Sequence, residues 1–226
     1  SKFCDFEKET WFASRKLDGV RCIVYKRGEF IMAYSRQGHE FTTLQKILDK
    51  VCENCEENVV LDGEVCLMDN DVEDFQGIMK EIKRKNHTIQ NAKYIVFDCL
   101  TIDEFDRKVS STIFSDRLKR LDGKFMDGNI VKLKHTYVKS IEHLNDIIST
   151  SNEMGYEGTM IRKDVVYEGK RTKKLLKCKS FFDAEYVVVD IDYEDFRIVQ
   201  NGREETVRMM AQVWIEHKGH RVKVGS

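Results

Sequence analysis

Several features are missing from this sequence, and their absence limits the classes of protein to which it can belong. Its 226 residues include no proline, where average usage of about 5% would give roughly eleven, and no functional consequence follows from that absence. There is no run of eighteen apolar residues, and the opening residues SKFCDFEKET lack the charged-then-apolar pattern of a signal peptide. We therefore expect neither a membrane span nor secretion, and we place the protein in the cytoplasm or the nucleus.

A strong net charge and a disulfide framework are also missing. The 38 Lys and Arg residues nearly balance the 39 Asp and Glu residues, so any surface that binds a polyanion must be a local one. Seven cysteines are an odd number, scattered among strand-like and helix-like segments, which is typical of reduced thiols. The histidines show no metal-ligand spacing, and we expect His39, His87 and His135 at surface or strand positions.

What is present predicts a globular α+β protein. An apolar content of 41% is enough to fill a core. Apolar residues recur at helical spacing in four segments, 44–51, 75–82, 114–121 and 141–148. Thr42 and Thr43 are good caps for the first helix and Ser140 for the last. Strand-like segments lie between the helices, and after Gly155 the pattern is all strand. We expect antiparallel sheets flanked by helices, and a domain boundary near residues 180–183.

One six-residue stretch, KLDGVR at 16–21, places a lysine where a strand-like run meets the Asp18-Gly19 turn. A lysine amine is nucleophilic only when it is neutral, and with an ordinary pKa near 10.4 about one lysine in a thousand is neutral at pH 7.4. Burial, a metal ion or cations such as Arg15 and Arg21 would favour the neutral amine. Lys16 is therefore a candidate nucleophile toward a carbonyl carbon or a phosphorus.

Other carboxylates and lysines favour phosphorus. LDGEV places Asp62 and Glu64 on one face of a strand, and Glu157 begins another strand. Mg²⁺ is usually held by few protein carboxylates, with substrate phosphates completing its shell, and such an ion stabilises charge in an in-line displacement. Lys177 and Lys179 share one strand face, where both can meet the same triphosphate. Taken singly, each of these features is more often a turn or a solvated edge.

The ordered set KLDGVR, SRQG, LDGEV, VFDCL, YEGTMIR and LLKCKS resembles the motifs of the covalent nucleotidyltransferases. The pair EGTMIR and LLKCKSFFDAEY looks most like the ATP-dependent DNA ligases, in the compact form common in viruses, and the resemblance covers nearly the whole chain. It implies an adenylation (nucleotidyltransferase) domain over 1–180 and an incomplete OB-fold domain over 181–226. It also implies ATP and Mg²⁺ as cofactors and nicked duplex DNA as the partner. No obligate protein partner is evident from the sequence, and we expect a monomer.

The resemblance assigns roles to the basic residues of the first motifs. In that family the lysine of K-x-D-G-x-R attacks the α-phosphate of ATP, expels pyrophosphate and carries AMP, and by resemblance this lysine is Lys16. Arg21 would contact the nucleotide sugar or phosphate, and Arg36 of SRQG would hold a phosphate of the nucleic acid. Both contacts suit a bidentate guanidinium.

The later motifs supply the remaining roles by the same resemblance. Glu64 would reach the ribose hydroxyl or the metal, and Glu157 would bind the metal. Phe97 of VFDCL would stack on adenine. Lys177 and Lys179 would hold the α-phosphate.

Three other functions stay open. An RNA ligase would share the lysine motif, although the OB-like start AEYVVVDIDYE argues against it. An mRNA-capping guanylyltransferase would use GTP, but LLKCKSF lacks the tryptophan and proline typical of that class. A non-catalytic nucleic-acid-binding module is the alternative of another kind. Arg36 and the basic runs at 80–87 and 171–174 are the candidates for a nucleic-acid face.

Overall fold

The computed structural model describes residues 4–55, 58–69, 72–125, 128–179, 185–200 and 202–225. The chain divides into two compact units, Ser1–Ser180 and Phe181–Ser226. The boundary segment that the sequence predicts, 180–183, lies outside the described residues. None of the helices in the described ranges has the length and apolar character needed to cross a bilayer.

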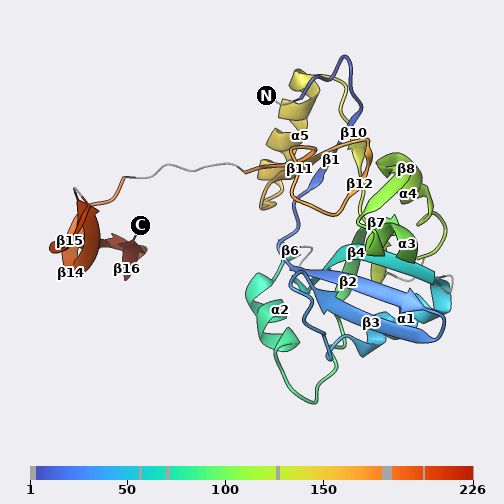
Figure 1. Cartoon of the computed structure of the whole chain (residues 1–226), viewed down its shortest axis with the longest axis horizontal. Coiled ribbons are helices and arrows are strands. Elements are labelled where there is room, and N and C mark those ends of the chain that lie inside the picture. Colours follow the sequence, from blue (N-terminus) through green and yellow to red (C-terminus); the bar gives the residue numbers. More distant parts are fainter. Residues whose placement is uncertain are drawn as a thin grey trace. The chain divides into compact units, whose positions relative to one another are not determined.

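A five-stranded sheet forms one half of the first unit (Figure 1). Its strands, in spatial order, are β3 (Phe30–Ser35), β2 (Val20–Arg27), β4 (Asn58–Cys66), β7 (Lys93–Leu100) and β9 (Ile130–Lys132). Neighbouring strands are antiparallel, except that β9 runs parallel to β7. Strand β4 continues through Asp62-Gly63, where a bulge shifts its register with β7. Its central residues, Val60 and Leu61, are fully buried, as the near-continuous apolar run of a central strand requires.

A four-stranded antiparallel sheet forms the other half. Its strands, in spatial order, are β10 (Thr136–Tyr137), β1 (Trp11–Arg15), β11 (Thr159–Lys163) and β13 (Leu175–Cys178). Trp11 and Ala13 alternate toward a small core that also contains Ile161. Two further strand pairs complete the unit: β5 (Met68–Asp69) with β6 (Val72–Glu73), and β8 (Val109–Ile113) with β12 (Val166–Glu168).

Five helices cover these sheets within the described residues. They are α1 (Gln45–Asn54), α2 (Phe75–Ile82), α3 (Ile102–Asp106), α4 (Phe114–Lys119) and α5 (Ile141–Glu153). The start of α5 is as predicted, because the Ser140 hydroxyl accepts a hydrogen bond from the His143 amide at 3.2 Å. The predicted cap of α1 is wrong. Leu44 is the N-cap and supplies no side-chain bond, while the Thr43 hydroxyl is buried without a hydrogen-bond partner among the described residues.

The second unit is a three-stranded antiparallel sheet of β14 (Val188–Gln200), β15 (Arg203–His217) and β16 (His220–Gly225). Ile191, Val213 and Val224 lie opposite one another across the three strands and so share one face. Ile191 and Val224 are exposed. The α+β class with antiparallel sheets and a β-structured C-terminal unit is confirmed.

Candidate active site

Lys16 lies where β1 ends, and the backbone holds it there. Its amide donates to the Gly158 carbonyl at 2.8 Å, which ties the lysine to the start of β11. The next residue, Leu17, is buried against Cys66 and Ile95, which belong to the five-stranded sheet. The lysine is therefore fixed between the two sheets by its neighbours on both sides.

The Lys16 ammonium pairs with the carboxylate of Glu157, and the same carboxylate pairs with the Lys179 ammonium. These residues come from three elements: the end of β1, the turn before β11, and the residue after β13. Partial burial raises the pKa of Glu157, but hydrogen bonds from the two lysines outweigh it and lower that pKa below the usual range. Three of the predicted site residues, Lys16, Glu157 and Lys179, are thus joined in one ion-pair network.

A pocket of about 180 Å³ opens beside Lys16. Its lining includes four predicted site residues, Lys16, Arg21, Glu64 and Phe97. The other residues lining it are Ser14, Arg15, Leu17, Leu133, His135, Met160, Arg162 and Leu175. The pocket therefore combines cations, one carboxylate and apolar or aromatic surface, which is the mixture a nucleotide requires.

Glu64 and Arg21 face each other across strands β4 and β2. Arg21 is oriented by Asp62, which accepts a hydrogen bond from its Nε at 2.9 Å. The Gly19 amide donates to Glu64 Oε1 at 3.3 Å, and a Cβ on Gly19 would lie 2.6 Å from the Val65 carbonyl oxygen. Only glycine allows this loop to approach β4 so closely.

The electrostatics of Glu64 differ from those of Glu157. Burial raises the pKa of Glu64 to about 7, even though the Gly19 amide, Lys16 and Arg21 oppose that change. Near neutral pH this carboxyl therefore gains or loses its proton with small changes in its surroundings. A cation or a hydroxyl donor placed against it would favour the ionised form.

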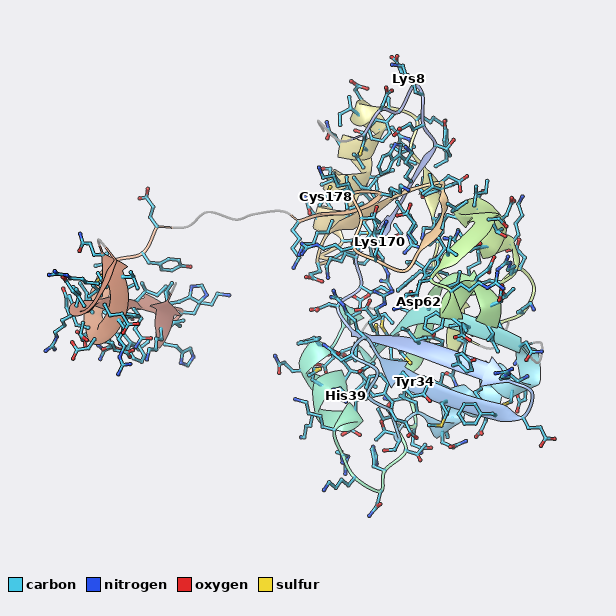
Figure 2. The ribbon with its side chains drawn as sticks, viewed as in Figure 1. Lys8, Tyr34, His39, Asp62, Lys170 and Cys178 are labelled. Atoms are coloured by element: carbon cyan, nitrogen blue, oxygen red, sulfur yellow. The ribbon has the colours of Figure 1, made fainter. Side chains whose placement is uncertain are left out.

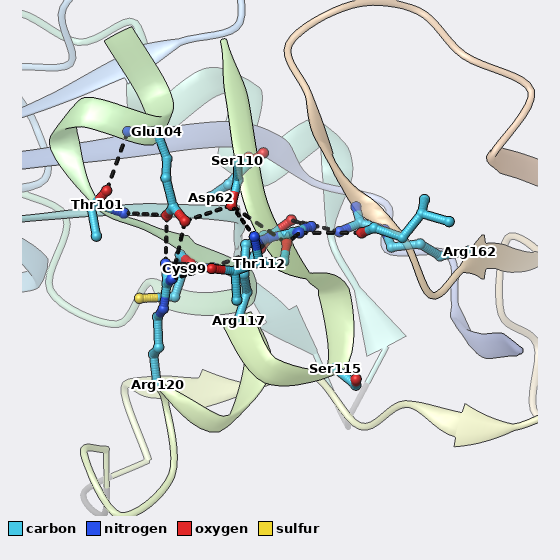
Figure 3. Close-up of polar contacts among 12 residues, drawn as sticks. Asp62, Cys99, Thr101, Glu104, Ser110, Thr112, Ser115, Arg117, Arg120 and Arg162 are labelled. Atoms are coloured by element: carbon cyan, nitrogen blue, oxygen red, sulfur yellow. Dashed lines mark hydrogen bonds and ion pairs between the residues drawn. The ribbon is translucent and has the colours of Figure 1, made fainter. Parts of the chain in front are cut away.

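Phe97 forms a wall of the pocket together with Arg162, whose guanidinium carbon lies 5.6 Å from the ring centroid. Arg162 donates to Asp98 at 2.9 Å, and Asp98 also accepts two bonds from Arg117, at 2.8 and 3.0 Å (Figure 3). Asp98 is only 3% exposed. This buried network fixes the direction of Arg162 and with it the surface behind Phe97.

Two other predicted residues lie at or beyond the rim of the pocket. Lys177 is opposite Met160 in the pairing of β13 with β11, so its side chain leaves the sheet on the pocket side. Arg36 is exposed in the turn after β3, between Tyr34 and His39, which Figure 2 labels. That turn belongs to the five-stranded sheet and lies away from Cys178 of β13 (Figure 2), so Arg36 does not join the pocket.

The basic run at 80–87 is partly neutralised within itself. Glu81 accepts a hydrogen bond from Arg84 at 2.9 Å and lies 2.5 Å from the His87 ring. In the loop at 171–174, Lys174 pairs with Glu168. Each run contains further cations. Because some of its positive charges are paired with acidic residues, neither run forms the continuous positive surface that its sequence indicates.

Arg162 and His135 are among the residues lining the pocket that were not predicted as site residues from the sequence. Arg162 lies two positions after Met160 in β11 and so shares the face of the strand that lines the pocket. This period of two was the available signal. His135 was expected at the surface or in a strand, but it lies between β9 and β10, half-buried in the pocket wall. Burial and the charge of Arg162 lower the pKa of His135 to about 4, so its ring is neutral at physiological pH.

The donor set gives a limited fit to Mg²⁺. No group of three or more His, Cys, Asp or Glu side chains that could hold a metal ion occurs in the described part of the chain. Glu64 and Glu157 are close enough to influence each other's charge. Mg²⁺ at phosphate-transfer sites is usually held by one or two carboxylates together with substrate phosphates, and Glu64 and Glu157 would supply two such carboxylates.

A family model and curated relatives both relate this chain to DNA ligases. The family model described as the ATP dependent DNA ligase domain matches residues 1–179. The DNA ligase of Thermococcus fumicolans is 27% identical over 225 residues, covering 93% of this chain and 39% of that protein. The SPbeta prophage-derived DNA ligase-like protein LigB of Bacillus subtilis is 25% identical over 198 residues, covering 86% of this chain and 70% of that protein.

Solved structures show the same relationship. The structure named Pmar-Lig_Pre is 27% identical, has a TM-score of 0.77, and is matched over 96% of this chain and 52% of its own. The Chlorella virus DNA ligase-adenylate, at 22% identity and a TM-score of 0.61 over the whole of this chain and 78% of its own, shares the fold. The chain thus spans about two fifths of the length of the Thermococcus relative and half of the first structure.

Proposed function

The chain belongs to the ATP-dependent DNA ligase domain family, and from that premise we propose that it adenylates its own Lys16 with ATP and seals nicks in duplex DNA. AMP passes from Lys16 to the 5′-phosphate at the nick, and the neighbouring 3′-hydroxyl then attacks that phosphate and releases AMP. The observation that carries the proposal is the placing of Lys16 in one pocket with Arg21, Glu64 and Phe97.

In the first step the Lys16 amine attacks the α-phosphorus, the bond to pyrophosphate breaks, and a phosphoramidate forms. The amine must lose a proton to act, and in the ligand-free chain its ammonium pairs with Glu157. A triphosphate next to Lys177 and Lys179 gives the Lys179 ammonium a more highly charged partner than Glu157, with which it pairs in the ligand-free chain. Glu157 and Glu64 would hold Mg²⁺, which supplies charge neutralisation on the phosphates when bound.

Aromatic and polar residues of the pocket position the rest of the nucleotide. The Phe97 ring supplies a stacking surface for adenine, an interaction worth about 1–3 kcal/mol per base in comparable sites. Arg21, held by Asp62 at 2.9 Å, contacts the sugar or phosphate region. Glu64 reaches the ribose hydroxyl when it is not engaged by the cation.

The two units take different parts in this proposal. The first, Ser1–Ser180, is the adenylation domain, and the second, Phe181–Ser226, is part of an OB-fold domain. Arg36 and the loop at 171–174 meet the phosphates of the nicked duplex, because both are positively charged and exposed at least in part. We propose that the chain acts on DNA as a monomer.

An RNA ligase and a capping guanylyltransferase remain the alternative enzymes, and a binding module the alternative without chemistry. The deciding experiment is intact mass spectrometry after incubation with Mg²⁺ and equimolar ATP and GTP. We expect an added AMP on the parent chain, none on Lys16→Arg, because a guanidinium stays charged, and the parent result on the surface control Lys46→Arg. An added GMP would indicate capping chemistry, and no adduct on the parent chain would favour the binding module.

A second experiment, with the adenylated chain, distinguishes DNA ligation from RNA ligation. Given nicked duplexes that differ only in carrying a DNA or an RNA strand at the 3′-hydroxyl side, we expect sealing of the all-DNA nick. Sealing of RNA-containing nicks alone would assign the chain to RNA ligation.

A further inference from the structure

His135 lies in the pocket without a role in the proposed chemistry. Its ring is near Phe114, with centroids 5.0 Å apart in an edge-to-face arrangement. Arg162 spans Phe114 and Phe97, with its guanidinium carbon 4.5 Å from one centroid and 5.6 Å from the other. Phe114 itself is fully buried behind the pocket, whereas His135, Arg162 and Phe97 all line it. A base stacked on Phe97 would therefore share this pocket of about 180 Å³ with His135.

The hydrogen bonding of His135 determines what it can offer to a ligand. Its Nδ1 lies 2.9 Å from the Leu133 carbonyl oxygen. A carbonyl only accepts, so Nδ1 carries the proton and donates. Because the low pKa keeps the ring neutral, Nε2 then has no proton and is a hydrogen-bond acceptor. The pocket therefore has a neutral acceptor held in one tautomer by the backbone.

We propose that Nε2 of His135 accepts a hydrogen bond from the exocyclic amino group of adenine and so selects ATP over GTP. Adenine presents an amino donor at the position where guanine presents a carbonyl oxygen. A fixed acceptor pairs with the first and repels the second. This inference rests on the proposed function, since it assumes that the pocket holds the base of the nucleotide.

The other polar groups in this wall do not offer the same selection. Arg162 is a donor only, and Asp98 already accepts one of its N–H groups at 2.9 Å. Glu64 is an acceptor, but it faces Arg21 across β2 and β4 and is assigned to the ribose and the cation. The Ser14 hydroxyl, which also lines the pocket, can both donate and accept and so does not discriminate between the two bases. Among the described side chains that line the pocket, His135 is the one whose uncharged ring nitrogen can only accept.

The test measures equilibrium binding of ATP, GTP and purine riboside triphosphate, which lacks the amino group, to the parent chain by calorimetry. The variants are His135→Leu and His135→Ala, with His39→Leu as the matched control, since His39 is exposed on the turn after β3. We expect the parent chain and the control to prefer ATP over the purine analogue by at least about tenfold. Both His135 variants should lose most of that preference and bind GTP relatively better.

The two hypotheses fail in different ways. If the parent chain prefers ATP and the His135 variants keep the full preference, another group such as Arg162 sets base choice and the inference is wrong. If the parent chain binds none of the three nucleotides, or binds them without forming the Lys16 adduct, the proposed function itself is wrong. The inference about His135, which rests on it, is then wrong as well. His135→Ala carries the test if His135→Leu does not fold, as judged by its circular dichroism and melting temperature.

Discussion

The ammonium of Lys16 donates to the carboxylate of Glu157, although 141 positions separate the two residues. The contact exists because the Lys16 amide is bound to the carbonyl of Gly158, the residue after Glu157. The same backbone bond that ends β1 thus sets a carboxylate against the candidate nucleophile. Glu157 can pair with Lys16 before nucleotide binds and can contribute to cation binding afterwards. The first role occupies the nucleophile and the second assists adenylation, so the two roles have opposite effects.

Glu157→Gln separates these roles. If the carboxylate acts chiefly in holding the cation and orienting Lys16, we expect the variant to adenylate on the order of 100-fold more slowly, because a neutral amide binds Mg²⁺ weakly. Single-turnover adenylation followed by intact mass provides the rate. Glu168→Gln is the control, since Glu168 pairs with Lys174 outside the pocket. A rate equal to or above that of the parent chain would mean that Glu157 only occupies Lys16 in an ion pair and does not assist adenylation.

Glu64 predicts a particular dependence of stability on pH. Its pKa is raised from 4.5 to about 7 by burial, so between these values the folded chain keeps a proton that the unfolded chain has released. The free energy of unfolding should therefore decrease as pH rises from about 4.5 to 7, by about 2 kcal/mol from this group.

Denaturant titrations at pH 5, 6, 7 and 8 measure this dependence. Glu64→Gln should flatten the decrease, because an amide does not titrate, while Glu53→Gln on the exposed face of α1 should leave it unchanged. A profile in which Glu64→Gln retains the whole decrease would assign the effect to another group.

The short motifs mark residues that lie in or at the ends of strands, and four of these residues, Lys16, Arg21, Glu64 and Phe97, line one pocket. Lys16 follows the last residue of β1, and Arg21 and Glu64 lie opposite each other in β2 and β4. Local patterns indicated these strands, but not the register that pairs Arg21 with Glu64. The network that joins Glu157 to Lys179 was not predictable, since it depends on the register of β11 with β13. Strand register across a long separation leaves no local trace in the sequence.

Other failures have local causes. Helix α3 has five residues, too few to show a helical period, although Thr101 and Glu104 form a capping box that marks its start. The cap of α1 was misplaced because Thr43 is buried, so its hydroxyl is not available to the helix end. His135 lies outside any strand or helix, where periodicity says nothing about burial.

Arg36 tests the nucleic-acid side of the proposal. If its guanidinium meets a backbone phosphate, Arg36→Ala should weaken binding of nicked duplex and reduce the slope of log K against log salt by about 1. Adenylation of Lys16 should be unchanged, because Arg36 lies outside the pocket. Fluorescence anisotropy from 50 to 200 mM salt measures both quantities. The control Arg107→Ala removes another exposed arginine, one that pairs with Asp103, and an equal loss of slope in both variants would indicate a general charge effect.

The last prediction concerns Asp98, which is buried and accepts from both Arg117 and Arg162. Asp98→Asn leaves two guanidiniums in the interior without their counter-charge, and breaking a buried pair in this way costs about 3–5 kcal/mol. Urea denaturation should show that loss, whereas Asp103→Asn, whose partner Arg107 is 72% exposed, should cost at most about 1 kcal/mol. Nucleotide affinity should fall as well, because Arg162 loses the anchor that holds it against Phe97. Equal stabilities for the two variants would mean that the packing of Phe97 and Phe114 alone keeps Arg162 in place.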